Sequence, residues 1–129
     1  MAVVFFSFTE ANRHTVAKIK GRAVNNKYPN LDFKVQDLLK RWDTEDEVVI
    51  RQAITKSIKG TSRTIVFVGK YTHKSIWVRE EVEMTLERDK PVYAIWLKEE
   101  SGVSPKCLTQ NGIKIYSWSE ERLQQLATK

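Results

Sequence analysis

The stretch Thr64-Ile65-Val66-Phe67-Val68 is an unbroken run of β-branched and aromatic side chains. Two further segments have the same character, Val3 to Phe6 and Val92 to Leu97. Continuous apolar runs of this length are typical of parallel strands that helices cover on both faces. We therefore predict that these three segments form the inner strands of a parallel sheet.

Two other segments alternate apolar with polar residues, namely Phe33 to Val35 and Ile113 to Tyr116. This alternation suits a strand with one less covered side, so we expect both at the edges of the sheet.

Helical patterns separate the expected strands. The clearest runs from about Glu45 to Lys59, with an apolar stripe of Ile50, Ala53, Ile54, Ser57 and Ile58. Thr44 with Glu47 predicts a capping box at its start, and Gly60 a stop at its end. Further helices are expected from Glu10 to Val24, from Ile76 to Arg88 with Ser75 as N-cap, and from Ser119 to Ala127. The segment from Glu99 to Gln110, by contrast, has the composition of a long loop.

The elements alternate between strand and helix, which is typical of an α/β fold. Since the first, third and fourth strands look buried, we predict a flavodoxin-like, doubly wound parallel sheet of five strands in the order 2-1-3-4-5. Such sheets bind ligands beyond the carboxyl ends of the strands, where the strand order reverses. Here this point is flanked by Ser7 to Glu10, Asp37 to Lys40 and Gly69 to His73.

The composition indicates one domain, residues 1–129, because 129 residues with 41% hydrophobic content suit a single core. The single cysteine, Cys107, excludes an internal disulfide. With only His14 and His73 besides, we expect no metal site of Cys and His. No signal peptide or membrane-length apolar run is evident, and we expect a cytoplasmic protein without membrane contact.

The sequence lacks the signature residues of several functional classes. The net charge of +6 is scattered rather than clustered, so we expect no specific nucleic-acid binding. The segment Ser7 to Asn12 has no glycine, which argues against a phosphate-binding loop. A receiver domain would need acidic residues where Phe6-Ser7-Phe8 and Val68-Gly69-Lys70 stand. Flavin binding by the hydroxyls of Ser7 and Thr9 is a weak alternative.

Trp77 and Glu81 are four residues apart at the start of the expected helix and therefore share a face. Glu81 has uncharged helical neighbours, whereas Glu80 and Glu83 have charged ones. A carboxylate at an apolar border tends toward a raised pKa, which is a common preparation for catalysis, although a helix N-terminus opposes the shift. The alternative is that Trp77 packs over the preceding loop and Glu81 is merely solvated.

The whole chain resembles Toll/interleukin-1 receptor (TIR) domains, and within them the bacterial TIR-like proteins of the Thoeris antiphage system. The similar segments follow the same order as in the family. Val4 to Phe8 resembles the first strand, and Ser62 to Gly69 resembles the third. Ser75 to Val82 resembles the Trp-Val-x-x-Glu helix, and Asn111 to Lys114 with the final helix resembles the closing segment.

The resemblance implies that Glu81 is the catalytic acid that cleaves the nicotinamide-ribose bond of NAD, which is then a substrate, with no cofactor or metal. A carboxylate near an oxocarbenium-like centre suits this chemistry. In Thoeris-like members the ADP-ribose part is closed on itself or joined to an acceptor, and a separate effector protein senses the product. The alternative is a non-catalytic TIR-like interaction module for signalling or phage sensing.

The resemblance also implies substrate-binding residues, namely Phe5, Phe8, Asp37, Trp77 and Tyr71. For Phe5, packing in the core is an equally good alternative to substrate binding. For Asp37, the alternative is that it is a turn residue after a strand. After the first strand, where several TIR enzymes carry arginines, this chain has Thr9-Glu10, so the means of holding the phosphates stays open. The resemblance further implies self-association through TIR contacts and a phage component as a trigger.

Overall fold

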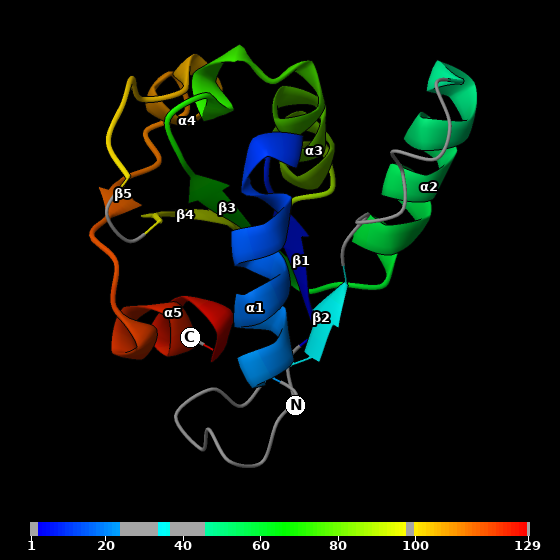
Figure 1. Ribbon diagram of the computed structural model, residues 1–129. Coiled ribbons are helices and arrows are strands. Elements are labelled where there is room, and N and C mark those ends of the chain that lie inside the picture. The colour runs from blue at the N-terminus through cyan, green and yellow to red at the C-terminus, as the bar shows by residue number, and fades with distance from the viewer. Residues whose placement is uncertain (1–2, 24–33, 37–45, 98–99, 129) are drawn as a thin grey trace.

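The computed structural model describes residues 3–23, 34–36, 46–97 and 100–128. Its centre is a parallel sheet with the strand order β2-β1-β3-β4-β5 (Figure 1). The α/β class and the parallel sheet predicted from the sequence are thereby confirmed. The strands are β1 (Val3–Ser7), β2 (Lys34–Gln36), β3 (Arg63–Val68), β4 (Val92–Trp96) and β5 (Ile115–Tyr116).

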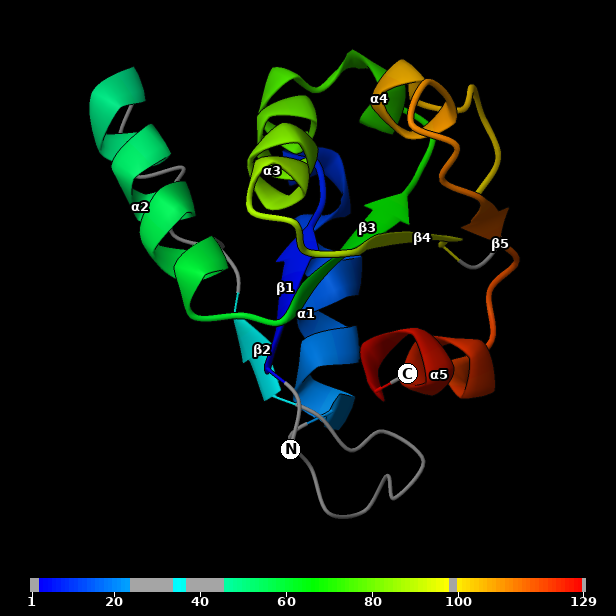
Figure 2. The same ribbon diagram turned by 180° about the vertical axis from the view of Figure 1, so that it is seen from behind.

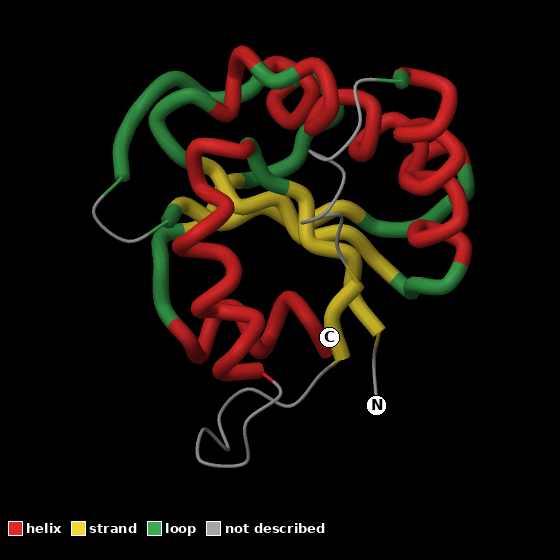
Figure 3. Tube along the Cα trace, turned by 45° about the vertical axis from the view of Figure 1, so that its right-hand side comes forward, coloured by secondary structure: helices red, strands yellow, loops and turns green. Residues whose placement is uncertain are grey.

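Helices cover both faces of the sheet, as Figures 2 and 3 show. Helices α1 and α5 pack on one face, and α2, α3 and α4 on the other. The described helices are η1 (Glu10–Asn12), α1 (Arg13–Ala23), α2 (Glu47–Lys59), η3 (Thr72–Lys74), α3 (Ile76–Glu87), α4 (Lys106–Thr109) and α5 (Glu120–Thr128). None of them is long and apolar enough to span a membrane.

The inner strands divide their side chains between two layers because successive residues of a strand point to opposite faces. In β3, Ile65 and Phe67 pack with α1 and α5, whereas Val66 and Val68 pack with α3. All four side chains are fully buried. This two-sided burial is the reason why the strand sequence is continuously apolar.

Helix α2 starts at a different cap from the one predicted. The Asp46 carboxylate accepts hydrogen bonds from the backbone N–H groups of Val48, at 3.0 Å, and Val49, at 3.4 Å. Glu47 is therefore the first helical residue instead of the third, and the predicted capping box of Thr44 with Glu47 is wrong. An aspartate N-cap also places negative charge at the positive end of the helix dipole. The predicted stop at Gly60 and the N-cap at Ser75 are confirmed.

The predicted loop from Glu99 to Gln110 contains the short helix α4, so the prediction is wrong over that helix. Leu108 is fully buried against Val78 and Val82 of α3, which anchors the turn. The Pro105 carbonyl accepts the first helical hydrogen bonds, from the N–H groups of Leu108 and Thr109. Tertiary packing, rather than a local pattern, fixes this helix.

Ile54 of α2 is fully buried beside Phe5, so Ile54→Ala removes well-packed methyl groups and leaves a cavity. We expect a loss of about 2–5 kcal/mol in the free energy of unfolding. Val48→Ala on the same helix, where the side chain is 63% exposed, is the control, with an expected change within about 0.5 kcal/mol. Urea titration of both variants measures the difference, and equal stabilities would contradict this packing.

Candidate active site

Glu81 is buried at the carboxyl edge of the sheet. Its side chain is 1% exposed, and it is the only buried charged residue in the part of the chain that the structure describes. The hydroxyl of Ser7, which is itself fully buried, donates a hydrogen bond to Glu81 Oε1 at 2.8 Å. The alternative of a solvated Glu81 is therefore wrong. Burying a carboxylate is costly unless it is hydrogen-bonded, and Ser7 supplies such a bond.

Ser7 reaches Glu81 because of where β1 ends. It is the last residue of β1 and pairs with Val66 of β3, so it lies where the strand order reverses between these two strands. Helix α3 follows β3 and packs back across β1 and β3. The alternation of side chains places Ser7 on the same face of β1 as Phe5.

Two buried threonines, Thr64 of β3 and Thr85 of α3, fix the rotation of α3 about its axis relative to β3. The Thr85 hydroxyl donates to the backbone carbonyl of Glu81 at 2.7 Å, and it lies 2.6 Å from the Thr64 hydroxyl. Both threonines are fully buried. These bonds tie the middle of α3 to β3 and so help to position the Glu81 side chain.

Glu80 has a different environment from Glu81. Its carboxylate pairs with Arg51 of α2, with 3.0 Å between Arg51 Nη1 and Glu80 Oε2. The Arg51 guanidinium also lies over the Trp77 ring, 5.6 Å from the ring centroid. The sequence-based choice of Glu81 over Glu80 as the residue among uncharged groups therefore agrees with the geometry.

The predicted substrate-binding residues lie in several environments. Phe5 is fully buried in a core cluster with Ile50, Ile54 and Ile58 of α2, and Trp77 is half-buried against the same cluster. The core-packing alternative thus describes the surroundings of Phe5. Trp77 and Glu81 both pack toward the face of β1 that carries Phe5 and Ser7.

Phe8 and Tyr71 lie away from that cluster. Phe8 is buried on the opposite face of the sheet with Phe6 and Val16. Tyr71 is 50% exposed, and Lys70 Nζ lies 5.6 Å from its ring centroid. Asp37 lies outside the described residues.

Asn12 joins three segments at the same edge, which the sequence did not reveal. Its side-chain oxygen accepts from the Thr9 hydroxyl at 3.0 Å, and its amide nitrogen donates to Glu100 Oε1 at 3.1 Å. The same side chain packs on Gly69, where a Cβ would lie 2.5 Å from Asn12 Oδ1. Only the burial of a polar residue just after a strand could have indicated this role, and burial is not visible in the sequence.

The backbone at the end of β3 is also held by a side chain. The Gly69 N–H donates to the Thr72 hydroxyl at 2.7 Å, and Thr72 is buried. No group of three or more His, Cys, Asp or Glu residues that could hold a metal occurs among the described residues. The described edge thus combines the hydroxyls of Ser7, Thr9 and Thr72 and the amide of Asn12 with two carboxylates, Glu100 and the buried Glu81.

Gly69→Ala tests the close packing at this edge. The added Cβ collides with a buried, hydrogen-bonded amide, so we expect a loss of about 1–3 kcal/mol in stability. Gly21→Ala in α1, where nothing lies within 4 Å of the new Cβ, should instead stabilise by about 0.5–1 kcal/mol. Thermal unfolding of both variants measures these changes in stability. A Gly69→Ala protein as stable as the parent would contradict the close contact between Gly69 and Asn12.

Solved structures of two other proteins share this fold. One is the TIR domain of the Toll-related receptor TRR-2 from Hydra magnipapillata, with a TM-score of 0.62 and 16% identity over 98% of this chain and 92% of that chain. The other is the CMP N-glycosidase BcmB of Clostridium botulinum, with a TM-score of 0.57 and 15% identity over 96% of this chain and 97% of that chain. The chain thus has the α/β fold that a TIR domain and an N-glycosidase share.

The sequence narrows this class further. The family model described as "Thoeris protein ThsB, TIR-like domain" matches residues 5–101, which is most of the chain. The protein therefore belongs to the Thoeris ThsB TIR-like family. None of the curated proteins is significantly similar in sequence.

Proposed function

We propose that this protein is an NAD-consuming enzyme that cleaves the nicotinamide-ribose bond and converts the ADP-ribose part into a signal nucleotide during antiphage defence. The observation that carries the proposal is the buried carboxylate of Glu81, hydrogen-bonded by Ser7 where the strand order reverses. Membership of the Thoeris TIR-like family supports it. The shared fold of a CMP N-glycosidase supports N-glycosidic bond cleavage as the reaction type.

The chemistry needs a fixed negative charge beside the ribose. When the bond between C1′ and the nicotinamide nitrogen breaks, its electron pair leaves with neutral nicotinamide and C1′ becomes oxocarbenium-like. The Glu81 carboxylate stabilises that positive charge, and the low dielectric of a buried site strengthens the interaction. A nucleophile then bonds to C1′ and releases a proton, giving a cyclic product from the same molecule or ADP-ribose from water.

Ser7 acts as a positioning residue in this proposal. Its hydroxyl donates to Glu81 Oε1 and so fixes the orientation of the carboxylate without touching the substrate. Among the predicted binding residues, Tyr71 is the exposed aromatic that meets the substrate directly. Phe5 acts through packing on the face that carries Glu81, and Phe8 through packing on the opposite face of the sheet. Asp37 and Trp77 remain proposed binding residues.

Substrate access requires a conformational step, since Glu81 is almost completely covered in this structure. We propose that self-association through TIR contacts, started by a phage component, opens or completes the site in the cytoplasm of the infected cell. Such a step would precede chemistry and keep NAD consumption low before infection. A separate effector protein then senses the product.

Glu81→Gln is the decisive variant. Glutamine keeps the shape and can still accept the Ser7 hydrogen bond, so the fold should persist while the loss of charge lowers the rate of NAD cleavage about 100-fold or more. The measurement is chromatographic separation of NAD, nicotinamide and ADP-ribose products, with protein concentrations high enough to favour self-association.

Glu80→Gln is the matched control, because it makes the same chemical change one residue away. Glu80 pairs with Arg51 near the surface, and such a pair contributes at most about 1 kcal/mol to stability. We expect the Glu80→Gln variant to cleave NAD at close to the rate of the parent protein. Turnover by Glu81→Gln equal to that of Glu80→Gln would refute the catalytic role and favour a non-catalytic interaction module.

Ser7→Ala tests the positioning role. Without its hydroxyl the carboxylate loses one hydrogen bond worth about 1.5–3 kcal/mol to a charged group, so kcat should fall about tenfold or more. KM for NAD should stay nearly constant, since Ser7 does not touch the substrate. A rise in KM with unchanged kcat would contradict this assignment.

A further inference from the structure

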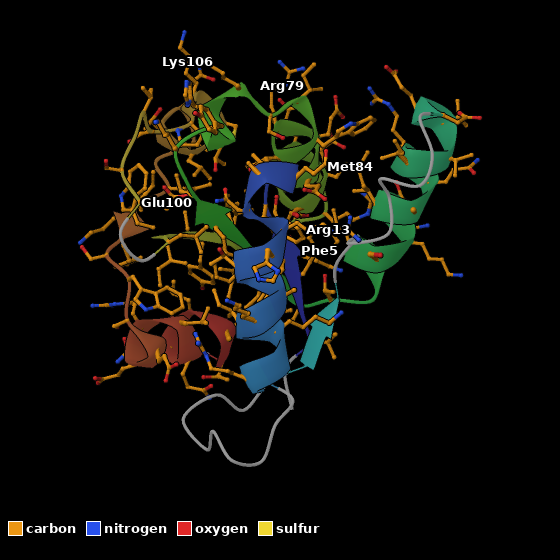
Figure 4. All side chains as sticks on the ribbon, in the orientation of Figure 1. Phe5, Arg13, Arg79, Met84, Glu100 and Lys106 are labelled. Atoms are coloured by element: carbon orange, nitrogen blue, oxygen red, sulfur yellow. The ribbon has the colours of Figure 1, made fainter. Side chains whose placement is uncertain are left out.

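A cavity lies between the start of α3 and the segment that leads into α4. Its volume is about 330 Å³, which is at the lower end of the range for small-molecule sites. One wall consists of η3 and the first turn of α3, and the other of residues 103–107. Figure 4 shows Arg79 and Lys106, which come from these two walls, at the same end of the molecule.

The cavity is strongly cationic. Lys74 of η3, Arg79 of α3 and Lys106 of α4 all line it, and no aspartate or glutamate occurs among its described lining residues. None of the three forms an ion pair with a residue that the structure describes. Glu83 of α3 is the acidic residue whose charge reaches the wall, where, after burial, it raises the pKa of Cys107. Three like charges from three segments repel one another across a small space, so an anion with several charges would relieve this repulsion.

Polar groups around the cavity add hydrogen-bonding capacity. Nδ1 of His73 is buried and has no hydrogen-bond partner among the residues that the structure describes, which is a costly state for a polar atom. Ser75 and Ile76, at the N-terminus of α3 where the helix dipole is positive, also line the cavity. His73, the last residue of the segment that the sequence places beside the reversal of the strand order, also lines this cavity.

The rim of the cavity carries apolar side chains. Ile76 and Val103 are 59% and 60% exposed, on opposite walls. Exposed aliphatic groups of this size beside cations suit a ligand with a charged group and an apolar or planar part.

We propose that this cavity binds a phosphorylated small molecule of about nucleotide size, with its phosphate against Lys74, Arg79 and Lys106 and its planar part between Ile76 and Val103. The site is distinct from Glu81, because Arg79 and Glu81 are two residues apart on a helix with about 3.6 residues per turn and therefore point in directions about 160° apart around α3. The inference does not depend on NAD cleavage. Since both sites are built on α3, ligand binding here would bias the position of Glu81.

The single cysteine is a reporter inside this cavity. Cys107 lines the wall and is half-buried, and burial raises the pKa of its thiol above the ordinary value. Alkylation needs the thiolate, so its rate at mildly alkaline pH is slow and sensitive to whatever covers the sulfur. The full chain is treated with a maleimide in the presence of increasing AMP, ADP or sodium pyrophosphate at constant ionic strength.

We expect ADP and AMP to slow the alkylation of Cys107 in a saturable manner, with pyrophosphate weaker because it lacks the planar part. The double variant Arg79→Gln with Lys106→Gln should bind ADP at least about tenfold more weakly. The matched control is Lys56→Gln with Lys59→Gln on the exposed side of α2, which removes the same charge and should leave protection unchanged. Urea titration verifies that both double variants fold.

Three results would overturn the proposal. They are protection that does not saturate, equal loss of protection in both double variants, and pyrophosphate binding as tight as ADP binding. The first two would mean that net charge alone, rather than a shaped site, attracts the anion, and the third that the planar part of the ligand is not recognised.

Discussion

A parallel sheet has to be covered by helices on both faces, and the rest of this structure depends on that constraint. The strand order β2-β1-β3-β4-β5 sends α1 to one face and α2 and α3 to the other, so the chain diverges between β1 and β3. Ser7 ends β1 at this divergence, and α3 crosses over it. The fold therefore brings a strand-end hydroxyl and a helix carboxylate together although 74 residues separate them in the chain.

Glu81 stands out because it interrupts an apolar helix face. Val78, Val82 and Thr85 are buried on the same helix, and an uncharged side chain at position 81 would satisfy the core without the cost of burying a charge. A buried carboxylate with a defined donor is typical of a functional site rather than of a stabilising contact. The neighbouring Glu80, paired with Arg51 near the surface, shows how the same residue type behaves without that constraint.

The sequence predicts the features that local patterns determine. Continuous apolar runs identify the inner strands, and the N-cap Ser75 follows from capping preferences. Helical spacing places Trp77 and Glu81 on one face, whereas the catalytic role of Glu81 is implied only by the resemblance to TIR enzymes. The cap at Asp46 is missed because Thr44 and Asp46 both precede the helix, and only hydrogen bonds distinguish them. Contacts such as that between Asn12 and Glu100 join residues that are 88 positions apart, and no local signal encodes them. Helix α4 is missed for the same reason, since the burial of Leu108 against α3 defines it.

The central claim, that the buried Glu81 carboxylate makes this TIR-like protein an enzyme, is tested most directly by mass-spectrometric analysis of nucleotides from cells. Cells carrying the protein are compared with and without phage, beside cells with an equal amount of the Glu81→Gln variant. If Glu81 is catalytic, an ADP-ribose derivative forms only with the unmodified protein. If no such species forms and the Glu81→Gln variant still protects the cells, Glu81 is not a catalytic residue.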